Sequence, residues 1–486
     1  MKVLYRLIAI IVIIYTAYVT NLCGQTKSIA ETTQTEEVNK VAKPLKEIRI
    51  MELQPQPILK NGKCVVIKEN YDLDGKNLVL EEGKTLEFNR GSFRNGYVTG
   101  NNTKIKGKTK AIFDNIRIRG SWIVEHVTTD MFRDLSYEQS LQDVLALTAP
   151  QVTNNVVIKE YGYKYVVKVT SVDMVAAPLK LKSNTDLQLD GRIQLKPTNL
   201  FQYVIMLIHE CSNVKIHGKG SITGDRTKHD YNIDEEHKAW KTHEWGHGLK
   251  IAQSKDIEIC GITVEDCIGD SYNIGNNSQR ILLDGVVAKG SRRQGVTIAV
   301  ASNVTIKNSH FNNIGRENGT SPGAAIDIEP DNTECEIENI KIEGCDICNC
   351  IQGVISWSHG YANSWEENIK GEKKQLSEKR HYVNLIIRDC RVEGTEHAFS
   401  LYGWDMAMIR KCKVTNSLYF AGCSSNTIFE DNDISVGYFM KDGSIISNGI
   451  IRDNRINAKN KIAIRLENSI FENNRYTRSS CVEVVN

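Results

Sequence analysis

The chain has 486 residues, of which 41% are hydrophobic and 25% charged, so it can bury a large core and is neither disordered nor fibrous. Proline is scarce (8 residues) and glycine common (35), which indicates tight connections made by Gly, Asn and Asp. The formal charge of +2 falls to zero without the N-terminal segment that carries Lys2 and Arg6. This balance lacks the basic footprint of a general nucleic-acid-binding protein, so we expect no nucleic-acid partner.

Residues 1–24 are typical of an export signal, because two basic residues precede an apolar run, Leu7 to Val19, that is too short to cross a bilayer. We therefore expect a periplasmic or secreted protein with no transmembrane segment in the mature chain. Two alternatives stay open: an N-terminal anchor, and a lipoprotein attached through Cys23. Residues 25–47 are polar and aperiodic and are predicted to form a flexible tether.

Residues 48–155 are predicted to form irregular first coils. The phrase from Tyr71 to Phe88 alternates apolar and polar residues across a glycine turn, and Gly91 to Gly107 continues in the same way. Ser136 to Ala149 has apolar residues near helical spacing, with Ser136 as the N-cap. We expect this helix to cap the open end of the domain that follows, where a terminal coil would expose unpaired strand edges.

Residues 156–486 consist of short β-rich phrases of the form Ser-x-apolar-x-apolar. Phrases that begin at Ser254, Ser278 and Ser302 are separated by 24 residues each. A β-propeller repeat is longer, roughly 40 residues or more. The period and the alternation predict an all-β fold, a parallel β-helix whose rungs lie about 4.8 Å apart.

The 13 cysteines would suggest disulfides in an exported protein. Their placement favours packing in a narrow core instead, because they recur at similar positions of the repeated phrases. The recurring residues are Cys260, Cys267, Cys335, Cys345, Cys390 and Cys412. Zinc is the alternative for the dense group Cys345, Cys348 and Cys350, which has no partner CxxC or histidine pair.

Five phrases of the chain, from Ile48 onward, carry a resemblance to a known family. They are Tyr71-Asp-Leu-Asp-Gly-Lys, Gly120-Ser-Trp-Ile-Val, Gly269-Asp-Ser-Tyr-Asn-Ile-Gly, Arg292-Arg-Gln-Gly-Val-Thr-Ile and Gly323-Ala-Ala-Ile-Asp-Ile-Glu-Pro. The chain resembles Bacteroidetes-type right-handed parallel β-helix proteins of the pectate-lyase-like superfamily. The resemblance implies the fold, but lyases, hydrolases, epimerases and phage tailspikes share this scaffold, so it does not choose the activity.

Aligning the repeated phrases places polar side chains at equivalent outward positions of successive coils. The predicted row is Lys250, Asn273, Thr297 and Asp327, with Glu329 two residues beyond on the same strand face. The residues that enter these strands are His247, Asp270 and Gln294, preceded on the third coil by Arg292 and Arg293. Hydrogen-bonding and charged groups therefore converge on one face, which favours a functional site over an ordinary solvated surface.

Insertions next to this row are candidates for the walls of a binding groove. The longest, Asp225 to Gly246, brings histidines and tryptophans that can titrate near neutrality and stack on sugar rings. The predicted substrate-binding residues are His243, Trp245, Asn273 and Gln294, with Glu317 and His359 on two further insertions and His397 and Trp404 on a later coil. For the last two, simple coverage of the core is the alternative.

A metal site is a further hypothesis. Asp327, Glu329 and Asp331 present three carboxylates over five residues, and Ca²⁺ favours such oxygen ligands. The spacing of His243 and His247 would suit zinc only on a helix, which the region does not predict.

The leading hypothesis for function is β-elimination on an acidic, uronic-acid-containing polysaccharide, such as the glycosaminoglycans chondroitin or hyaluronan. Arg292 or Arg293 would neutralise the substrate carboxylate. His247 or Lys250 would act as the base, and Tyr272 or a histidine would donate a proton to the leaving oxygen. An inward position of Tyr272, by strand alternation, is the alternative for that residue.

Two other functions stay open. Hydrolysis would use a pair of carboxylates chosen from Asp270, Asp327 and Glu329. Gly246-His247-Gly248 matches a fragment of the polygalacturonases, but it precedes the acidic coils instead of following them. A non-catalytic glycan-binding solenoid would need the tryptophans and arginines without a tuned acid or base.

Overall fold

The computed structural model describes most of the chain after the first 44 residues. The described residues are 45–133, 140–159, 164–167, 178–232, 243–329, 336–356, 381–401, 403–422, 424–440, 445–460, 462–476 and 482–485. The predicted signal segment and most of the predicted tether therefore lie outside them. The chain divides into two compact units, Met1–Lys46 and Glu47–Asn486, and the second contains the strands.

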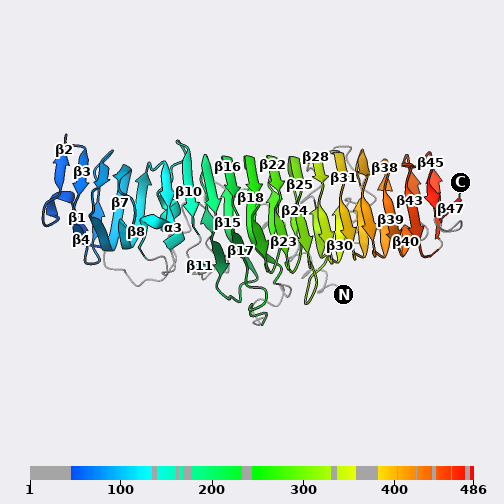
Figure 1. Ribbon diagram of the computed structural model, residues 1–486, viewed down its shortest axis with the longest axis horizontal. Helices are drawn as coiled ribbons and strands as arrows, with labels where there is room; N and C mark the ends of the chain where they lie inside the picture. Colours follow the sequence, from blue (N-terminus) through cyan, green and yellow to red (C-terminus); the bar gives the residue numbers. More distant parts are fainter. Residues whose placement is uncertain are drawn as a thin grey trace, which may run out of the picture. The chain divides into compact units, whose positions relative to one another are not determined.

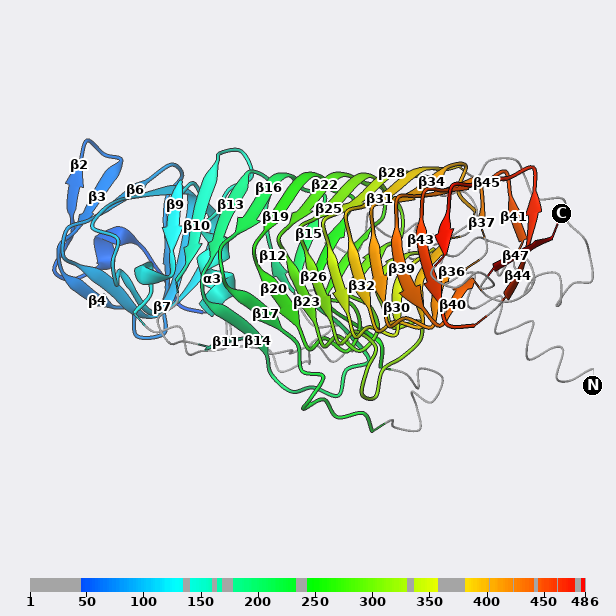
Figure 2. The same cartoon turned by 45° about the vertical axis from the view of Figure 1, so that its right-hand side comes forward.

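Three long parallel sheets build most of the second unit, and each coil in the middle of the β-helix adds one strand to each sheet (Figures 1 and 2). The result is a right-handed parallel β-helix, as the sequence predicts. In the described part of the chain, sheet 1 consists of β9 (His126–Thr128), β10 (Asn154–Ile158), β13 (Thr185–Leu189), β16 (Ser212–His217), β19 (Lys255–Cys260), β22 (Ser278–Asp284), β25 (Ala301–Lys307), β28 (Glu336–Glu343), β31 (His381–Arg388), β34 (Ala407–Arg410), β38 (Thr427–Glu430), β42 (Ile450–Arg452) and β45 (Ile470–Glu472).

Sheets 2 and 3 complete the coils. Sheet 2 consists of β11 (Lys164–Val167), β14 (Arg192–Leu195), β17 (Ser221–Thr223), β20 (Thr263–Glu265), β23 (Val287–Lys289), β26 (His310–Asn312), β29 (Asp346–Cys348), β32 (Arg391–Glu393), β35 (Lys413–Thr415), β39 (Asp433–Val436), β43 (Arg455–Ala458) and β46 (Arg475–Tyr476). Sheet 3 consists of β12 (Leu179–Lys180), β15 (Gln202–His209), β18 (Trp245–Ala252), β21 (Tyr272–Gly275), β24 (Val296–Ile298), β27 (Ala324–Ile328), β30 (Gln352–Ser356), β33 (His397–Leu401), β36 (Tyr419–Ala421) and β40 (Tyr438–Met440). A short fourth sheet near the C-terminus consists of β37 (Ser424–Ser425), β41 (Ile445–Ser447), β44 (Ile462–Glu467) and β47 (Val482–Val485).

Stacked apolar side chains fill the space between the sheets. In sheet 1, Ile257 pairs with Ile281, and Ile281 pairs with Val304, so the two coils differ by one residue in length. All three side chains are buried. Burial of one such side chain contributes about 1.5–3 kcal/mol, and the gain repeats on every coil.

The corner between sheets 1 and 2 explains the use of Gly, Asn and Asp. From β16 onward, the residue after each sheet 1 strand adopts a positive φ, as in Gly285 (62°), Asn308 (51°) and Asp431 (57°). Glycine, asparagine and aspartate tolerate this conformation best. The residue that follows the corner points inward and stacks on its equivalents in neighbouring coils. From β28 onward these inward residues are Cys345, Cys390, Cys412, Asn432 and Asn454.

The cysteines mostly occupy the core, as predicted. Cys211, Cys267, Cys345, Cys350, Cys390 and Cys412 are buried free thiols. Cys260 differs, because it is half-buried and its thiol contacts Glu258, and Cys335 lies outside the described residues. The zinc alternative does not fit, since Cys348 is exposed whereas Cys345 and Cys350 are buried, so the three thiols do not converge.

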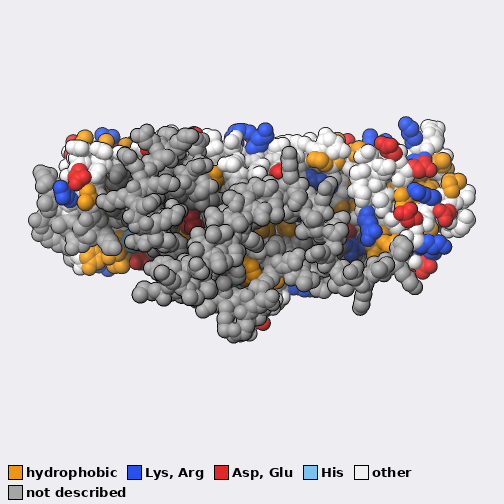
Figure 3. All heavy atoms as spheres, turned by 180° about the vertical axis from the view of Figure 1, so that it is seen from behind, with side chains coloured by type: hydrophobic (Ala, Val, Ile, Leu, Met, Phe, Trp, Pro, Cys, Tyr) orange, Lys and Arg blue, Asp and Glu red, His pale blue; other side chains and the backbone are white. Residues whose placement is uncertain are grey.

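The N-terminal coils continue the stack less regularly. Their strands are β1 (Glu47–Ile48), β2 (Ile58–Lys60), β3 (Cys64–Ile67), β4 (Asn70–Asp72), β5 (Asn77–Val79), β6 (Thr85–Phe88), β7 (Ser92–Gly107) and β8 (Phe113–Trp122). All pair in parallel except β2 with β3. Acidic and basic side chains are interspersed on the face shown in Figure 3, and Arg94 pairs with Asp72 at 3.0 Å.

One α-helix, α3 (Ser140–Ala146), is found in the described part of the chain, besides the 3₁₀ turns η1 (Ile50–Glu52) and η2 (Thr129–Met131). It contacts β8, β9 and β12, and Asp143 accepts a hydrogen bond from the backbone N–H of Ile118 (2.8 Å). The helix therefore lies between the N-terminal strands and the main solenoid (Figure 1), not over a free end as predicted, because its apolar face is buried against strands on both sides. None of the helices among the described residues is long and apolar enough to span a membrane.

Candidate active site

The strand register reproduces the predicted outward row of sheet 3. Lys250 of β18 pairs with Asn273 of β21, Asn273 with Thr297 of β24, and Thr297 with Asp327 of β27. Neighbouring members are therefore one rung, about 4.8 Å, apart. Four successive coils thus place amide, hydroxyl, amine and carboxyl groups side by side.

A fully buried carboxylate, Asp270, organises the groups around this row. Its Oδ2 accepts hydrogen bonds from Asn273 Nδ2 (3.0 Å) and Thr297 Oγ1 (2.8 Å). The same oxygen lies 3.3 Å from His247 Nδ1, and Oδ1 lies 3.5 Å from Arg293 Nη1. One carboxylate therefore positions an imidazole and a guanidinium from the two coils on either side of it.

His247 is held as a neutral imidazole. Burial lowers its pKa to about 4, and the positive charges of Lys250 and Arg293 act in the same direction, against the attraction of Asp270. The His247 side chain keeps 12% of its surface exposed. Asp270 presents both its backbone N–H and its carboxylate to Nδ1, each at 3.3 Å, so either neutral tautomer finds a partner.

Arg293 remains cationic in a largely buried position. Burial lowers its pKa, but Asp270 and Glu329 outweigh this effect and raise it. Its guanidinium donates to Glu329 Oε2 (3.0 Å) and to Gln294 Oε1 (2.9 Å). Glu329 is 43% exposed and therefore forms the solvent side of this cluster.

Asp327 is a buried acid. Gln294 donates from its amide to Asp327 Oδ2, whereas Oδ1 accepts no hydrogen bond from any described residue. Burial raises the pKa of Asp327 well above its usual range, and the negative charges of Glu329 and Asp270 add to this shift against Arg293. This raised pKa favours the protonated form of the Asp327 carboxyl group.

The calcium hypothesis gains no support from this arrangement. Asp327 is bonded to Gln294 and Glu329 to Arg293, while Asp331 lies outside the described residues. Within the part that the structure describes, no cluster of three or more His, Cys, Asp or Glu side chains has the geometry to hold a metal ion.

A second buried polar chain anchors the Asp225 to Gly246 insertion, and the sequence reasoning missed it. Asp225 Oδ2 contacts His229 Nδ1 (2.9 Å), and His229 Nε2 contacts His243 Nδ1 (2.8 Å). Asp225 also accepts hydrogen bonds from the Tyr203 hydroxyl (2.8 Å) and from Thr198. Thr198 and Tyr203 belong to another coil, so the sequence does not place them beside Asp225. The spacing of Asp225 and His229 was the one signal in the sequence for this hydrogen-bonded series.

Arg292 belongs to this anchor and not to the predicted charge-neutralising group. It is buried, and it donates to the carbonyl oxygens of Asn318 (2.7 Å) and His243 (3.1 Å). Its guanidinium also lies 4.7 Å from the centre of the Tyr231 ring. Since Arg292 connects two insertions through their backbones, it is a positioning residue. Burial also lowers the pKa of His243, with His229 and Arg292 acting in the same direction.

Tyr272 has a core role, contrary to the predicted role as a proton donor, and Trp404 has the core role that was expected as the alternative to sugar binding. Tyr272 pairs with Leu249 and Val296 in the inward row and is fully buried. Its hydroxyl donates to backbone carbonyls at 3.1 and 3.3 Å, so it cannot reach a substrate. Trp404 is buried, and its indole N–H donates to Ser356 Oγ (2.9 Å).

The remaining predicted binding residues are spread along the solenoid. Trp245 opens β18 beside the cluster and is 38% exposed. His397, several rungs further on, stacks on Tyr419 with 4.8 Å between the ring centres. Glu317 is exposed, and its backbone carbonyl accepts from Arg226 Nη1 (3.1 Å). His359 lies outside the described residues.

No family model matches the chain. Two curated relatives come from Bacillus subtilis. The SPbeta prophage-derived uncharacterized protein YorA is 26% identical over 219 residues, 45% of this chain and 32% of YorA. The uncharacterized protein YclG is 26% identical over 165 residues, 32% of this chain and 28% of YclG. The matches thus span about a third of each relative's length, and they do not support the expected Bacteroidetes type.

Solved structures share the β-helix at low identity. The family 28 exopolygalacturonase of Yersinia enterocolitica is 11% identical, with a TM-score of 0.48, and the match covers 76% of this chain and 78% of that one. The A-module of the mannuronan C-5 epimerase AlgE4 of Azotobacter vinelandii is 12% identical, with a TM-score of 0.47 and coverage of 74% and 97%. The Streptococcus pneumoniae surface adhesin PfbA is 14% identical, with a TM-score of 0.41 and coverage of 74% and 92%. These likenesses concern the β-helix fold alone and assign no activity.

Proposed function

We propose that the protein cleaves an acidic, uronic-acid-containing polysaccharide by β-elimination on the outer face of sheet 3. The observation that carries the proposal is that one buried carboxylate, Asp270, contacts both a neutral imidazole, His247, and a guanidinium, Arg293. A base and a carboxylate-binding cation are the two groups that such an elimination needs most.

His247 is the proposed base. In the tautomer that carries its proton on Nδ1, which lies 3.3 Å from the Asp270 carboxylate, Nε2 has the lone pair and takes the proton next to the substrate carboxylate. The imidazolium that forms is then stabilised by Asp270. A low pKa keeps the base form populated at neutral and mildly acidic pH.

Arg293 is the proposed carboxylate ligand. In the substrate-free protein it is paired with Glu329, whose side chain is 43% exposed and can move into solvent. A uronate carboxylate would then take the place of Glu329 with a bidentate contact. Lys250, at a half-exposed position of the same row, is the proposed proton donor to the leaving oxygen in place of Tyr272.

Ultraviolet absorbance during digestion of a panel of acidic polysaccharides tests the proposal. Chondroitin and hyaluronan come first in the panel, followed by pectic and alginate chains. Elimination creates an unsaturated, absorbing product with each new chain end. A panel on which the protein makes new reducing ends without absorbance would overturn β-elimination, and one on which it makes neither would favour a glycan-binding solenoid.

Export through residues 1–24 stays part of the proposal, and the N-terminal mass of the native protein tests it.

Hydrolysis is the second candidate, and the raised pKa of Asp327 favours it. A carboxyl group with a raised pKa is typical of the general acid of a glycosidase, and Asp270 would supply the second carboxyl group. Both carboxyl groups are fully buried beneath His247, Arg293 and Glu329, so they would have to be uncovered before they could reach a glycosidic oxygen. Because this uncovering costs free energy, we rank hydrolysis below β-elimination as the proposed reaction.

A further inference from the structure

The outer face of sheet 1 carries a row of charged residues, one at the end of each strand, which we call the charge row. Strand pairing places them in one register from coil to coil. Its members from β22 to β45 are Asp284, Lys307, Glu343, Arg388, Arg410, Glu430, Arg452 and Glu472.

The charge row alternates in sign at every step but one. Lys307 pairs with Asp284 (3.2 Å) and Arg388 with Glu343 (3.0 Å), while Glu430 holds Arg410 (3.0 Å) and Arg452 (2.6 Å). The exception is the step from Arg388 to Arg410, where two guanidinium groups occupy neighbouring rungs about 4.8 Å apart. Like charges at directly opposite positions of neighbouring strands repel each other. An anion bound between Arg388 and Arg410 would relieve this repulsion.

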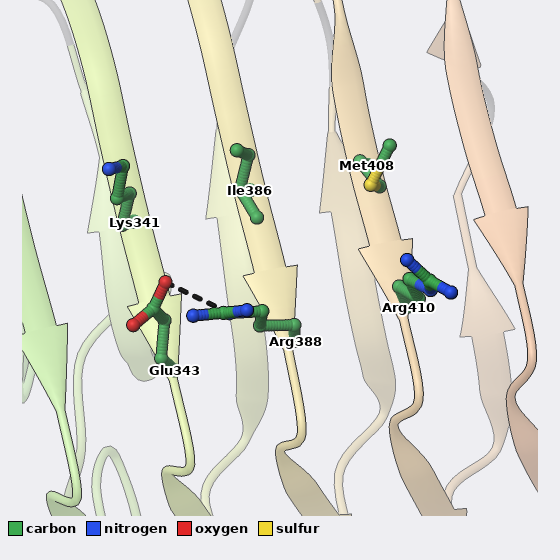
Figure 4. A pocket seen from close by; sticks show the side chains of 6 residues that line it. All are labelled: Lys341, Glu343, Ile386, Arg388, Met408 and Arg410. Atoms are coloured by element: carbon green, nitrogen blue, oxygen red, sulfur yellow. Dashed lines mark hydrogen bonds and ion pairs between the residues drawn. The ribbon is translucent and has the colours of Figure 1, made fainter.

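A cavity of about 290 Å³ lies at this step. Figure 4 shows Glu343 of β28 turned toward Arg388 of β31, with Arg410 on the next strand, β34. Ile386 and Met408 lie on the same two strands as the arginines, two residues before each of them. Lys341 adds a third cation to the lining. The lining therefore combines three cationic groups with a single carboxylate and an apolar floor.

The shared partner of Arg410 increases this imbalance. Glu430 divides its two oxygens between Arg410 and Arg452, so Arg410 has only part of one carboxylate, besides Asp431 at 3.6 Å. Both arginines of the mismatched step keep exposed side chains, 51% for Arg388 and 43% for Arg410. They can turn toward a ligand without uncovering the core.

We propose that this cavity binds one anionic sugar unit, with Arg388 and Arg410 holding its carboxylate or sulfate group and Ile386 and Met408 contacting the C–H face of its ring. The volume is at the lower end of small-ligand sites, about 300 Å³, which suits a single ring. The site belongs to sheet 1, whereas Asp270 and His247 belong to sheet 3, so it would retain an acidic polysaccharide outside the cleavage site. It does not depend on the cleavage reaction.

Methyl NMR of the full chain tests this site directly. The chain has 8 methionines, and with labelled methionine methyl groups the Met408 signal is assigned from its loss in Met408→Leu. The probes are a galacturonic acid hexasaccharide, a heparin-derived hexasaccharide, a neutral xylan hexasaccharide and inorganic sulfate. We expect the Met408 signal to move with at least one of the two acidic oligosaccharides and to stay in place with the neutral one.

Two variants make the test specific. Arg388→Gln combined with Arg410→Gln should weaken the affinity read from the Met408 signal by about tenfold to a hundredfold per lost contact. Arg280→Gln is the matched control, because Arg280 of β22 is a similarly exposed arginine of sheet 1 that pairs with Asp256 (2.6 Å) outside the cavity, and it should leave the affinity within about twofold.

Several outcomes would overturn the site. They are a Met408 signal that moves equally with the neutral oligosaccharide, one that stays in place with every probe, or one whose response survives the double substitution. A response to sulfate without a response to either acidic oligosaccharide would overturn the sugar assignment. The absorbance assay decides the cleavage reaction separately, so the failure of one proposal is distinguishable from the failure of the other.

Discussion

The outer faces of sheets 1 and 3 are built from the same repeating coil but treat charge in opposite ways. The charge row of sheet 1 pairs opposite signs between neighbouring rungs, with side chains such as Glu343 and Arg388 a quarter to a half exposed. Sheet 3 buries Asp270 and Asp327 completely and surrounds them with polar partners. The β-helix fold itself does not require buried carboxylates, because on sheet 1 the same coils keep their charged side chains partly exposed to solvent.

This difference indicates that the buried carboxylates of sheet 3 lower the stability of the protein and are kept for function. Exposed ion pairs contribute about 0–1 kcal/mol each, and they are easily replaced. Buried carboxylates are expensive unless every oxygen finds a partner, and Asp270 Oδ1 and Asp327 Oδ1 accept no hydrogen bond from a described residue. Shifted pKa values together with unsatisfied buried oxygens are typical of catalytic sites. The contrast is therefore testable residue by residue.

The largest effect is expected from His247→Gln. Removal of a general base lowers the rate by about 10² to 10⁴, whereas glutamine keeps a hydrogen-bonding side chain beside Asp270. Initial rates of absorbance change on the identified substrate measure this. In the wild type the rate should fall in acid only as the pH approaches about 4, the pKa of His247.

His310→Gln is the matched control, because His310 lies beside Asp346 (3.4 Å) on sheet 2 with an exposed side chain. It should keep the wild-type rate. A folded His247→Gln variant with the wild-type rate would remove His247 from the reaction and turn attention to the buried carboxyl groups.

Arg293→Ala comes next, with an expected loss of about tenfold to a hundredfold in kcat/KM. The reason is the loss of a charge-assisted contact worth about 1.5–3 kcal/mol. Arg293→Lys should recover only part of it, since an ammonium group cannot make the bidentate contact. Wild-type kinetics in the alanine variant would contradict the proposed role as the carboxylate ligand.

Much of this contrast could be predicted from the sequence, because the apolar positions of the repeated phrases set the register of the strands. The row from Lys250 to Asp327 followed from aligned phrases, and the structure pairs the same residues. Strand alternation also indicates the inward position of Tyr272, which lies two residues before the buried Ile274, so the proposed donor role went against this pattern. The Asp225–His229–His243 chain escaped prediction because Thr198 and Tyr203, which complete it, come from another coil.

A core substitution should separate stability from activity. Asn454 is buried, and its amide group donates to the carbonyl of Phe429 (2.9 Å) and to Asn474 Oδ1 (2.9 Å) while its Oδ1 accepts from Asn432 (2.9 Å). Asn454→Ala leaves these groups without partners and should lower the free energy of unfolding by about 1–3 kcal/mol. Denaturant unfolding measures the loss. Because solenoid coils contact mainly their neighbours, kcat/KM should stay at the wild-type value, and a parallel loss of activity would argue against a local effect.

The smallest effect, and the one that best separates the two reactions, is expected from Asp327→Asn. The pKa of Asp327 is raised above its ordinary value of 3.8 in the folded protein, so the folded state binds a proton that the unfolded state has released. The stability that this proton contributes is present at pH below 3.8 and is lost as the pH rises through the raised pKa. Asparagine cannot lose a proton and can still accept from Gln294, so the variant should be more stable than the wild type at neutral pH, with the gain disappearing toward pH 3.8. Thermal unfolding across this range measures the gain.

Under β-elimination the rate of the Asp327→Asn variant should change by less than about tenfold, whereas loss of a general acid would lower the rate by about 10² to 10⁴. A stable Asp327→Asn variant with such a large loss would therefore move the assignment to hydrolysis.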